Sequence, residues 1–376
     1  MKVLYIGVYR DGTGYGQAAE DYILSLDSVG IDVVCRPLKL NNVNHEPNPI
    51  INKLESKSSK NCDIVIQHVL PIHMQYNGNF DYNIGLFAYE TSNFKMSGWK
   101  NYLNLMDANI VINNQMITSC INSGVTTPLH LVPHARNFSN YVEKYEKLET
   151  ITSQVSSSDF IFYTIGEMTK RKNFSALLKA YFTEFSESEP VCLFVKTNKS
   201  TYEFYDYCGK ILDGLSIKNP PKVISMTERI SDDDINRIHY TCDAFVQPSY
   251  GEAWSIPAFD AMAFGKTPIV TNCTGYREYI DDSVGWLVEG HDEPIFAADK
   301  QVDDIYTYNE TWFSVDIMDL KRKMRECYEK EGIRRLKAQN ALDRAYEFSY
   351  EKVGSIFLEV LKNVAKEKKT ELVRRG

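Results

Sequence analysis

The chain lacks long hydrophobic runs, paired cysteines and clustered histidines, and each absence argues against a class of protein. No apolar run approaches the roughly 20 residues of a membrane-spanning helix, and the run at the N-terminus stops before Arg10, too early for a signal peptide. The eight cysteines form no Cys-x-x-Cys pair, and the seven histidines show the His-x-x-x-His spacing once, at His130 and His134, at the end of a predicted strand rather than in a helix. We therefore expect a cytoplasmic protein without a disulfide framework or a bound metal.

An excess of positive charge is also lacking. The formal net charge of -8 argues against a non-specific nucleic-acid binder, which usually shows a basic footprint. A composition of 43% hydrophobic and 24% charged residues is typical of a folded globular protein. Its 376 residues exceed one typical core, so two or three domains of about 150 residues are expected.

What the chain does contain is a repeated alternation of short β-rich runs with helical patterns. One series extends from residues 3–8 to 129–132, and a second from 160–165 to 268–270. This alternation predicts an α/β protein with two Rossmann-like, doubly wound domains facing a central cleft. In such sheets ligands bind outside the carboxyl ends of the strands.

The two series are separated by a charged and serine-rich stretch at residues 143–158, which we interpret as the interdomain linker. The predicted domains are residues 1–148 and 159–345. The pattern from Asp316 onward is almost wholly helical, and residues 346–376 are expected to form a helical segment that packs on the first domain.

The most informative segment is the run from Gln247 to Lys266. It places Glu252 on a loop, Pro257 in the first turn of a helix with Ser255 as its expected cap, and Asp260 early in that helix. Amides at a helix start favour phosphate, and carboxylates accept hydrogen bonds from hydroxyls, so the segment suits a sugar nucleotide. The alternative is an exposed loop acid and an acid that merely complements the helix dipole.

Two other turns follow the first strand of each series. Arg171 and Lys172 lie between a strand and a helix, where a planar fork and a point charge could clamp a diphosphate. The alternative is a solvated basic turn. In the first series, Gly14 and Gly16 open the first helix and allow close approach of backbone to a ligand, although a plain tight turn explains them equally well.

Two single residues end strands of the first series. Glu90 and His134 are candidates for the acceptor side of the cleft. The alternative for each is a structural role. For His134 this is a common arrangement, because a histidine beside a proline at a strand end often serves as an anchor.

Taken together, these motifs resemble the retaining glycosyltransferases of family four, which have the GT-B fold. The resemblance rests on residues 248–252, residues 256–265 and the turn from Gly166 to Asn173, with weaker matches around Glu90, residues 107–111 and His134. It implies transfer of a sugar from a nucleotide-diphosphate sugar to an unidentified acceptor, with retention of configuration.

The resemblance also implies roles for individual residues. Glu252 would hold the sugar hydroxyls, Arg171 and Lys172 the diphosphate, and Asp260 the ribose. The remaining donor contacts would come from the amides of Ala253, Trp254 and Ser255, from the base region at Glu228 and Arg229, and from Gly14 and Gly16.

Two departures from the family pattern keep other interpretations open. Asp260 replaces a glutamate, and Glu167 stands where the family has an arginine. The alternatives are a catalytically weak or inactive glycan-binding subunit, and a sugar-nucleotide epimerase on the same fold.

The resemblance implies no cofactor and no metal, since the leaving diphosphate would be stabilised by cations and amides. It also implies a glycan, lipid-linked or protein acceptor. The basic run at residues 362–375 suits peripheral contact with the inner face of a membrane, although a solvated final helix is the simpler interpretation.

Overall fold

The computed structural model describes residues 1–40, 45–137, 145–295 and 306–375, with the side chains of the last helix described as far as Lys366. The chain forms two compact units. Unit 1 comprises Met1–Asn137, Val302–Glu310 and Glu347–Gly376, and unit 2 comprises Phe138–Gln301 and Thr311–Tyr346.

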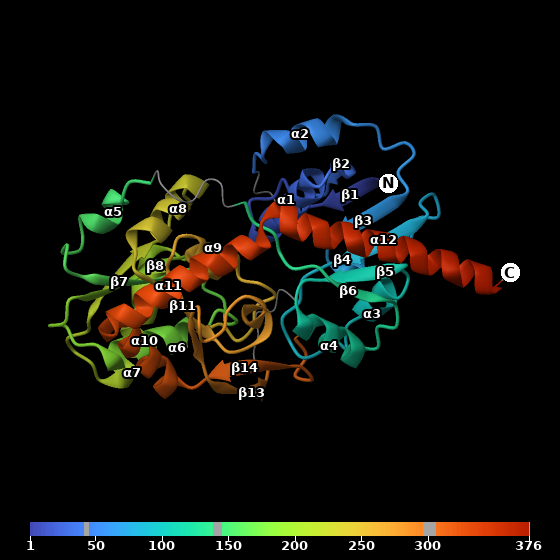
Figure 1. The fold of residues 1–376 in the computed structure, drawn as a ribbon. Helices are drawn as coiled ribbons and strands as arrows, with labels where there is room; N and C mark the ends of the chain where they lie inside the picture. The colour runs from blue at the N-terminus through green and yellow to red at the C-terminus, as the bar shows by residue number, and fades with distance from the viewer. Residues whose placement is uncertain (41–44, 138–144, 296–305, 376) are drawn as a thin grey trace. The chain divides into compact units, whose positions relative to one another are not determined.

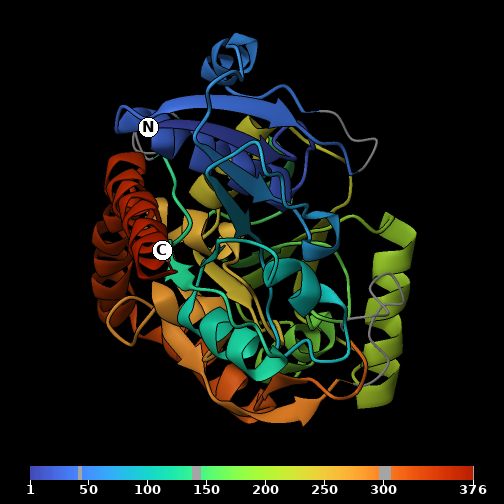
Figure 2. The same cartoon turned by 90° about the vertical axis from the view of Figure 1, so that its right-hand side faces the viewer.

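Unit 1 is built on a parallel sheet of six strands in the order β2-β1-β3-β4-β5-β6. Its strands, coloured blue to teal, run side by side in Figures 1 and 2. All residues of the inner strands β3, β4 and β5 are buried, as expected for a parallel sheet covered on both faces. The strands are β1 (Lys2–Gly7), β2 (Asp32–Pro37), β3 (Ile64–His68), β4 (Tyr82–Leu86), β5 (Ala108–Val111) and β6 (Leu129–Leu131).

The C-terminal helix of the chain packs on the first helix of unit 1. Gly354 permits the contact, because a Cβ atom there would lie 2.1 Å from the carbonyl oxygen of Ser25. The Phe357 ring meets Tyr22 edge to face with centroids 5.7 Å apart. The helices of this unit are α1 (Gly14–Ser28), α2 (Pro49–Ser56), α3 (Trp99–Leu103), α4 (Asn114–Ser123) and α12 (Tyr350–Arg375).

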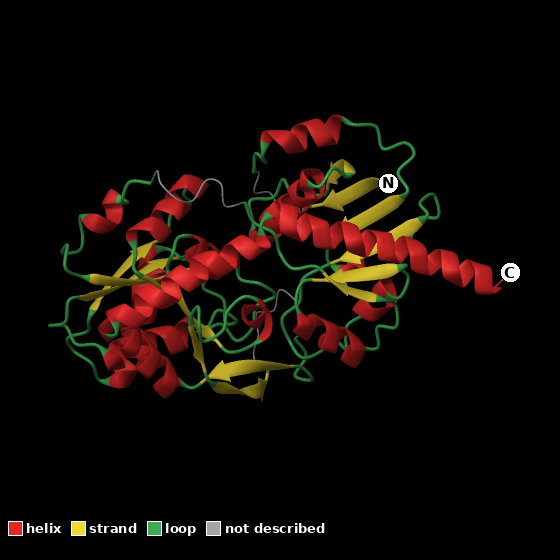
Figure 3. Ribbon diagram, in the orientation of Figure 1, coloured by secondary structure: helices red, strands yellow, loops and turns green. Residues whose placement is uncertain are grey.

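Unit 2 has a second parallel sheet of six strands, in the order β12-β11-β10-β7-β8-β9, and a separate two-stranded hairpin. Figure 3 shows the helices of this unit around the sheet and the β13–β14 hairpin apart from it. The strands are β7 (Phe160–Ile165), β8 (Val191–Lys196), β9 (Lys222–Met226), β10 (Ala244–Gln247), β11 (Thr267–Thr271), β12 (Trp286–Val288), β13 (Gly290–Pro294) and β14 (Thr311–Val315).

The core of unit 2 lies between this sheet and its helices. Phe162, Leu193 and Val246 from three adjacent strands pack with Leu177 of the helix that follows β7, and all four are at most 1% exposed. The helices are α5 (Glu149–Thr152), α6 (Phe174–Glu184), α7 (Thr201–Leu215), α8 (Asp232–Thr241), α9 (Ile256–Ala263), α10 (Ile317–Glu329) and α11 (Glu331–Ala345).

Each sheet has a point at which its strand order reverses. In unit 1 the chain passes from β1 to β2 on one side and then to β3 on the other. In unit 2 it proceeds from β7 outward to β8 and β9 and then returns to β10 on the opposite side of β7. The loops after β7 and β10 therefore lie at this reversal point, at the carboxyl ends of the strands, which is the usual ligand position in such sheets.

The predicted fold class, two doubly wound parallel sheets, is confirmed, as is the helical tail, whose first helix is capped by Asp316. The hairpin was not predicted, since β13 exposes most of its residues and lacks an apolar face.

The described part of the expected linker packs on unit 2, where Leu148 N donates to Thr241 Oγ1 (2.8 Å) and Ile151 is buried. Residues 143 and 144 of that linker lie outside the described residues.

Within the described part of the chain, none of the helices combines the length and apolar character needed to cross a membrane. The predicted membrane contact of the C-terminal run stays a prediction, since its side chains after Lys366 lie outside the described residues.

Candidate functional site

The loop after β10 carries Glu252 and is fixed by the segment that follows β11. The amide of Glu252 donates to Thr274 Oγ1 (3.0 Å), and its carbonyl accepts from the amide of Gly275 (2.9 Å). Only glycine fits at position 275, because a Cβ atom there would lie 2.1 Å from the carbonyl oxygen of Ala253. Glu252 is therefore held on a closely packed loop.

The basic turn after β7 ends where Asn173 adopts a left-handed conformation (φ 51°) and caps α6 through its side chain, which accepts from Ala176 N. The turn is joined to the neighbouring loop by a backbone hydrogen bond of 2.9 Å from Tyr250 N to Arg171 O. The residues that the sequence analysis assigned to sugar and diphosphate thus lie on two loops that contact each other.

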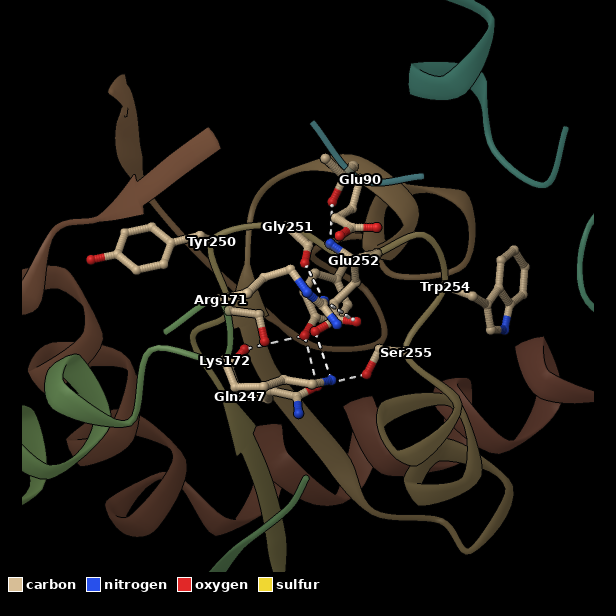
Figure 4. A network of polar contacts seen from close by, with 12 residues as sticks. Glu90, Arg171, Lys172, Gln247, Tyr250, Gly251, Glu252, Trp254 and Ser255 are labelled. Carbon is tan, nitrogen blue, oxygen red and sulfur yellow. Dashed lines mark hydrogen bonds and ion pairs between the residues drawn. The ribbon is translucent and has the colours of Figure 1, made fainter. Parts of the chain in front are cut away.

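The central feature of the site is a group of three ionic side chains, a buried carboxylate and two partly buried cations (Figure 4). Arg171 Nη1 lies 2.8 Å from one carboxylate oxygen of Glu252, and Lys172 Nζ lies 2.8 Å from the other. Arg171 Nη1 also donates to the carbonyl of Gly251 at 2.8 Å. The Glu252 side chain is only 6% exposed, so the interpretation of Glu252 as an exposed loop acid is wrong.

The two cations determine the charge of Glu252. Burial by itself would raise the pKa of this carboxyl, but the charges and hydrogen bonds of Arg171 and Lys172 outweigh it and lower the pKa to about 2. The carboxylate is therefore ionised at neutral pH and acts only as a hydrogen-bond acceptor. With so low a pKa it is a poor proton acceptor, which argues against a general-base role.

The start of α9 differs from the prediction in one respect. Pro257 lies in the first turn as expected, but Ser255, at the capping position, makes no side-chain cap. Its backbone is left-handed (φ 70°), and its hydroxyl donates instead to Gln247 Oε1 at 2.6 Å. Capping by Ser255 is therefore wrong, because a buried glutamine takes up the hydroxyl.

Two of the predicted donor residues, Asp260 and Trp254, are buried in this structure. Asp260, in α9, is 3% exposed and lies near two buried phenols: burial is the main cause of the raised pKa of Tyr163 and Tyr279, and the Asp260 charge adds to it. Trp254 is also 3% exposed, and its carbonyl accepts from Tyr279 Oη at 2.6 Å. The role of Asp260 toward a ribose stays a prediction, as do the amide roles of Ala253 and Trp254.

Glu228 and Arg229 lie in the loop after β9 and are exposed. They are near the carboxyl end of β8, where burial lowers the pKa of Lys196 and the charge of Glu228 opposes that shift. Their assignment to a base-binding region stays a prediction.

The candidates in unit 1 have contacts within the chain that explain them in part. Gly16 donates from its amide to Thr13 Oγ1 (3.1 Å), and a Cβ atom there would lie 2.0 Å from the carbonyl oxygen of Asp11. Close packing therefore accounts for this glycine. Gly14 is the first residue of α1.

Glu90 and His134 also have partners inside unit 1. Glu90 accepts a hydrogen bond from Tyr306 Oη. His134 is 1% exposed, and its Nε2 lies 3.3 Å from Asp21 Oδ2, which Arg136 also contacts at 3.2 Å. These contacts favour the structural interpretation of His134, while an acceptor role for Glu90 stays a prediction.

The residues that support the site were not predicted. Around the Glu252 loop, Gln247, Gly275, Tyr276 and Tyr279 are buried and Thr274 is partly buried, and the last three and Thr274 follow β11 rather than β10. The position of Gln247 at the end of a buried strand was the one available signal in the sequence.

The chain is similar to known proteins in sequence and in fold. Residues 212–307 match the family described as "Glycosyl transferases group 1". A serotype-specific mannosyltransferase, WbdA of Escherichia coli, is 22% identical over 217 residues, which are 57% of this chain and 23% of the relative. The chain therefore spans less than a quarter of the length of that curated relative.

Solved structures share the fold over nearly the whole chain. The Anabaena protein HepE in complex with UDP-glucose superposes with a TM-score of 0.67 at 13% identity, covering 96% of this chain and 100% of HepE. Sucrose-phosphate synthase from Thermosynechococcus elongatus gives 0.66 at 12% identity, covering 98% and 100%. The chain has the GT-B fold, and its second unit contains a segment similar to group 1 glycosyltransferases.

Proposed function

We propose that the protein is a glycosyltransferase that moves a hexosyl group from a nucleotide-diphosphate sugar to an acceptor, with retention of configuration. The observation that carries the proposal is the ionic group of Glu252, Arg171 and Lys172 at the reversal point of the second sheet. The match to group 1 glycosyltransferases, the fold shared with a UDP-glucose complex and the similarity to a mannosyltransferase support it.

The charges of this group suggest how a donor would bind. The cations are partnered by Glu252, so a diphosphate would replace that carboxylate as their partner. Glu252, ionised at neutral pH, would then accept hydrogen bonds from sugar hydroxyls. Donor binding is thus expected to separate the cations, which would contact the diphosphate, from Glu252, which would contact the sugar.

The same group would stabilise the leaving diphosphate. Negative charge grows on the leaving oxygen during transfer, and the arginine fork, the lysine and the amides at the start of α9, which no side chain caps, would stabilise it. We assign the acceptor proton to the departing phosphate, because Glu252 is proposed to hold the sugar hydroxyls.

The test is transfer of labelled sugar from a panel of uridine-, guanosine- and adenosine-diphosphate sugars to simple glycoside acceptors. We expect transfer from at least one donor, and loss of transfer in Glu252→Ala with the circular dichroism spectrum unchanged. Absence of both transfer and donor hydrolysis with every donor would favour the interpretation of an inactive glycan-binding subunit. A changed sugar without any acceptor would instead indicate an epimerase.

A further inference from the structure

Ser255 has a backbone conformation that is unfavourable for serine, and it lies at a helix start, where a serine side chain usually caps the helix. A non-glycine residue in the left-handed region costs of the order of 1 kcal/mol or more. Serine before a helix normally turns its hydroxyl onto the first amides. Ser255 has φ 70° and ψ 80°, and its side chain makes no such cap on α9.

Three buried side chains hold Ser255 in this state. Gln247 Oε1 accepts both from the Ser255 hydroxyl at 2.6 Å and from Tyr276 Oη at 2.8 Å. Tyr279 Oη lies 3.2 Å from the Ser255 carbonyl oxygen, which it reaches as a donor. Gln247 is itself fixed by a hydrogen bond of 3.3 Å from its Nε2 to the carbonyl of Ile165, at the end of β7. Gln247 is 1% exposed and both tyrosines are fully buried.

This arrangement adjoins the cations of the site. A Cβ atom at Gly166 would lie 3.4 Å from Gln247 Nε2 and 3.6 Å from Lys172 Cε, so the glutamine and the lysine border the same glycine. In Figure 4 the Ser255 hydroxyl is turned toward Gln247, on the side of the site where Lys172 lies. The conformation of Ser255 therefore determines what lies at the start of α9 beside the ionic group.

We propose that Gln247, Tyr276 and Tyr279 are positioning residues that keep the Ser255 hydroxyl away from the start of α9, so that its amides remain available to the donor diphosphate. Without Gln247, Ser255 returns to the extended conformation and caps the helix with its own hydroxyl. The hydroxyl then competes with the diphosphate for the same amides. This inference rests on the proposed function, because it concerns the same donor site.

The test uses Gln247→Met, a substitution of similar size, in the full chain titrated with uridine and guanosine diphosphates. A helix cap is worth about 1 kcal/mol, so we expect the affinity for the diphosphate to fall roughly five- to tenfold. The double variant Gln247→Met/Ser255→Gly is expected to recover that affinity, because glycine adopts the left-handed conformation readily and has no hydroxyl to compete. Ser255→Gly alone is expected to raise the thermal midpoint.

A merely structural role for Gln247 predicts a different result, namely a loss of affinity that Ser255→Gly does not recover. That result, or an unchanged affinity in Gln247→Met, would overturn the proposal. Gln67→Met is the matched control, since Gln67 is also a buried glutamine near the end of a parallel strand, but in unit 1. It is expected to leave diphosphate affinity unchanged.

The titration distinguishes failure of the positioning role from failure of the proposed function. If no nucleoside diphosphate binds the unmodified protein, the proposed function fails. If one binds and Gln247→Met binds it equally well, only the positioning role fails.

Discussion

The two units have sheets of the same kind, but their reversal points are filled in opposite ways. In unit 1, at the ends of β1 and β3, the Tyr15 ring lies 4.8 Å from the ring of His68, whose Nδ1 is 2.6 Å from Tyr5 Oη. In unit 2, at the ends of β7 and β10, the corresponding region holds Glu252 with two cations.

The electrostatic consequences are also opposite. Burial, with a smaller effect from His134, lowers the pKa of His68 to about 3, so this ring is neutral at physiological pH. Glu252 stays ionised because its cations outweigh burial. The two sheets therefore share a reversal point but differ in the side chains there, and the ionic group of unit 2 is the one suited to a charged ligand.

The strongest test of this comparison removes one cation from each unit and measures sugar transfer. Lys172→Met is expected to lower the rate of sugar transfer by a factor of about 100 or more, the usual effect of losing one group that stabilises a leaving anion. Arg10→Met removes a cation from the loop after β1, where Arg10 Nη2 pairs with Glu55 at 2.6 Å. We expect little change in transfer from this control, and equal losses in both variants would contradict the assignment.

A second comparison concerns the two closely packed glycines. Gly275→Ala and Gly16→Ala each place a methyl group about 2 Å from a backbone oxygen, and each is expected to lower the free energy of unfolding by about 1–3 kcal/mol. Only Gly275→Ala is expected to weaken nucleoside diphosphate binding as well, because it displaces the Glu252 loop. Denaturant titration and calorimetry would measure the two effects. Weaker diphosphate binding in Gly16→Ala would instead support the donor role predicted for Gly16.

The units should also respond to acid at different pH values. The pKa of His68 is about 3 when folded against 6.5 ordinarily, so the unfolded chain takes up a proton first and stability falls as the pH drops below 6.5. The pKa of Glu252 is about 2 against 4.5, so its contribution is lost only as the pH drops below 4.5.

At pH 5 the linked loss in unit 1 is about 2 kcal/mol, at about 1.4 kcal/mol per pH unit. Hydrogen exchange of peptides from β3 and β10, corrected for intrinsic rates, would measure it. We expect lower protection in β3 than at pH 7 and little change in β10, with the difference reduced in His68→Gln. Equal losses of protection in both strands would contradict the comparison.

The smallest predicted change in binding affinity comes from a variant that separates diphosphate binding from transfer. Glu252→Gln removes the anion that competes for Arg171 and Lys172, so the affinity for a nucleoside diphosphate should rise, by roughly three- to tenfold, while transfer is lost. Glu55→Gln, which removes the partner of Arg10, is the matched control and should leave both unchanged. Weaker diphosphate binding in Glu252→Gln would show that the carboxylate does not compete with this ligand.

The sequence predicted the sheets and the position of Glu252, Arg171 and Lys172 at one site because both depend on local patterns, but it did not predict the ion pairs among these side chains. Buried apolar runs mark parallel strands, and the positions of Lys172 and Glu252 after strand ends placed them at one edge of a sheet. The conformation of Ser255 could not be predicted in this way, since it depends on Tyr276 and Tyr279, which reach it from another strand connection. His134 was open for a similar reason, as its partner Asp21 lies on α1.

The central claim is that the ionic group of Glu252, Arg171 and Lys172 in unit 2 forms the binding site for the diphosphate of a sugar nucleotide. Isothermal titration of the full chain with uridine and guanosine diphosphates, in unmodified protein, Lys172→Met and Arg10→Met, tests it most directly. The account predicts saturable binding of at least one diphosphate, weakened about tenfold or more by Lys172→Met and unchanged by Arg10→Met. Absence of binding, or equal binding by all three proteins, would contradict it.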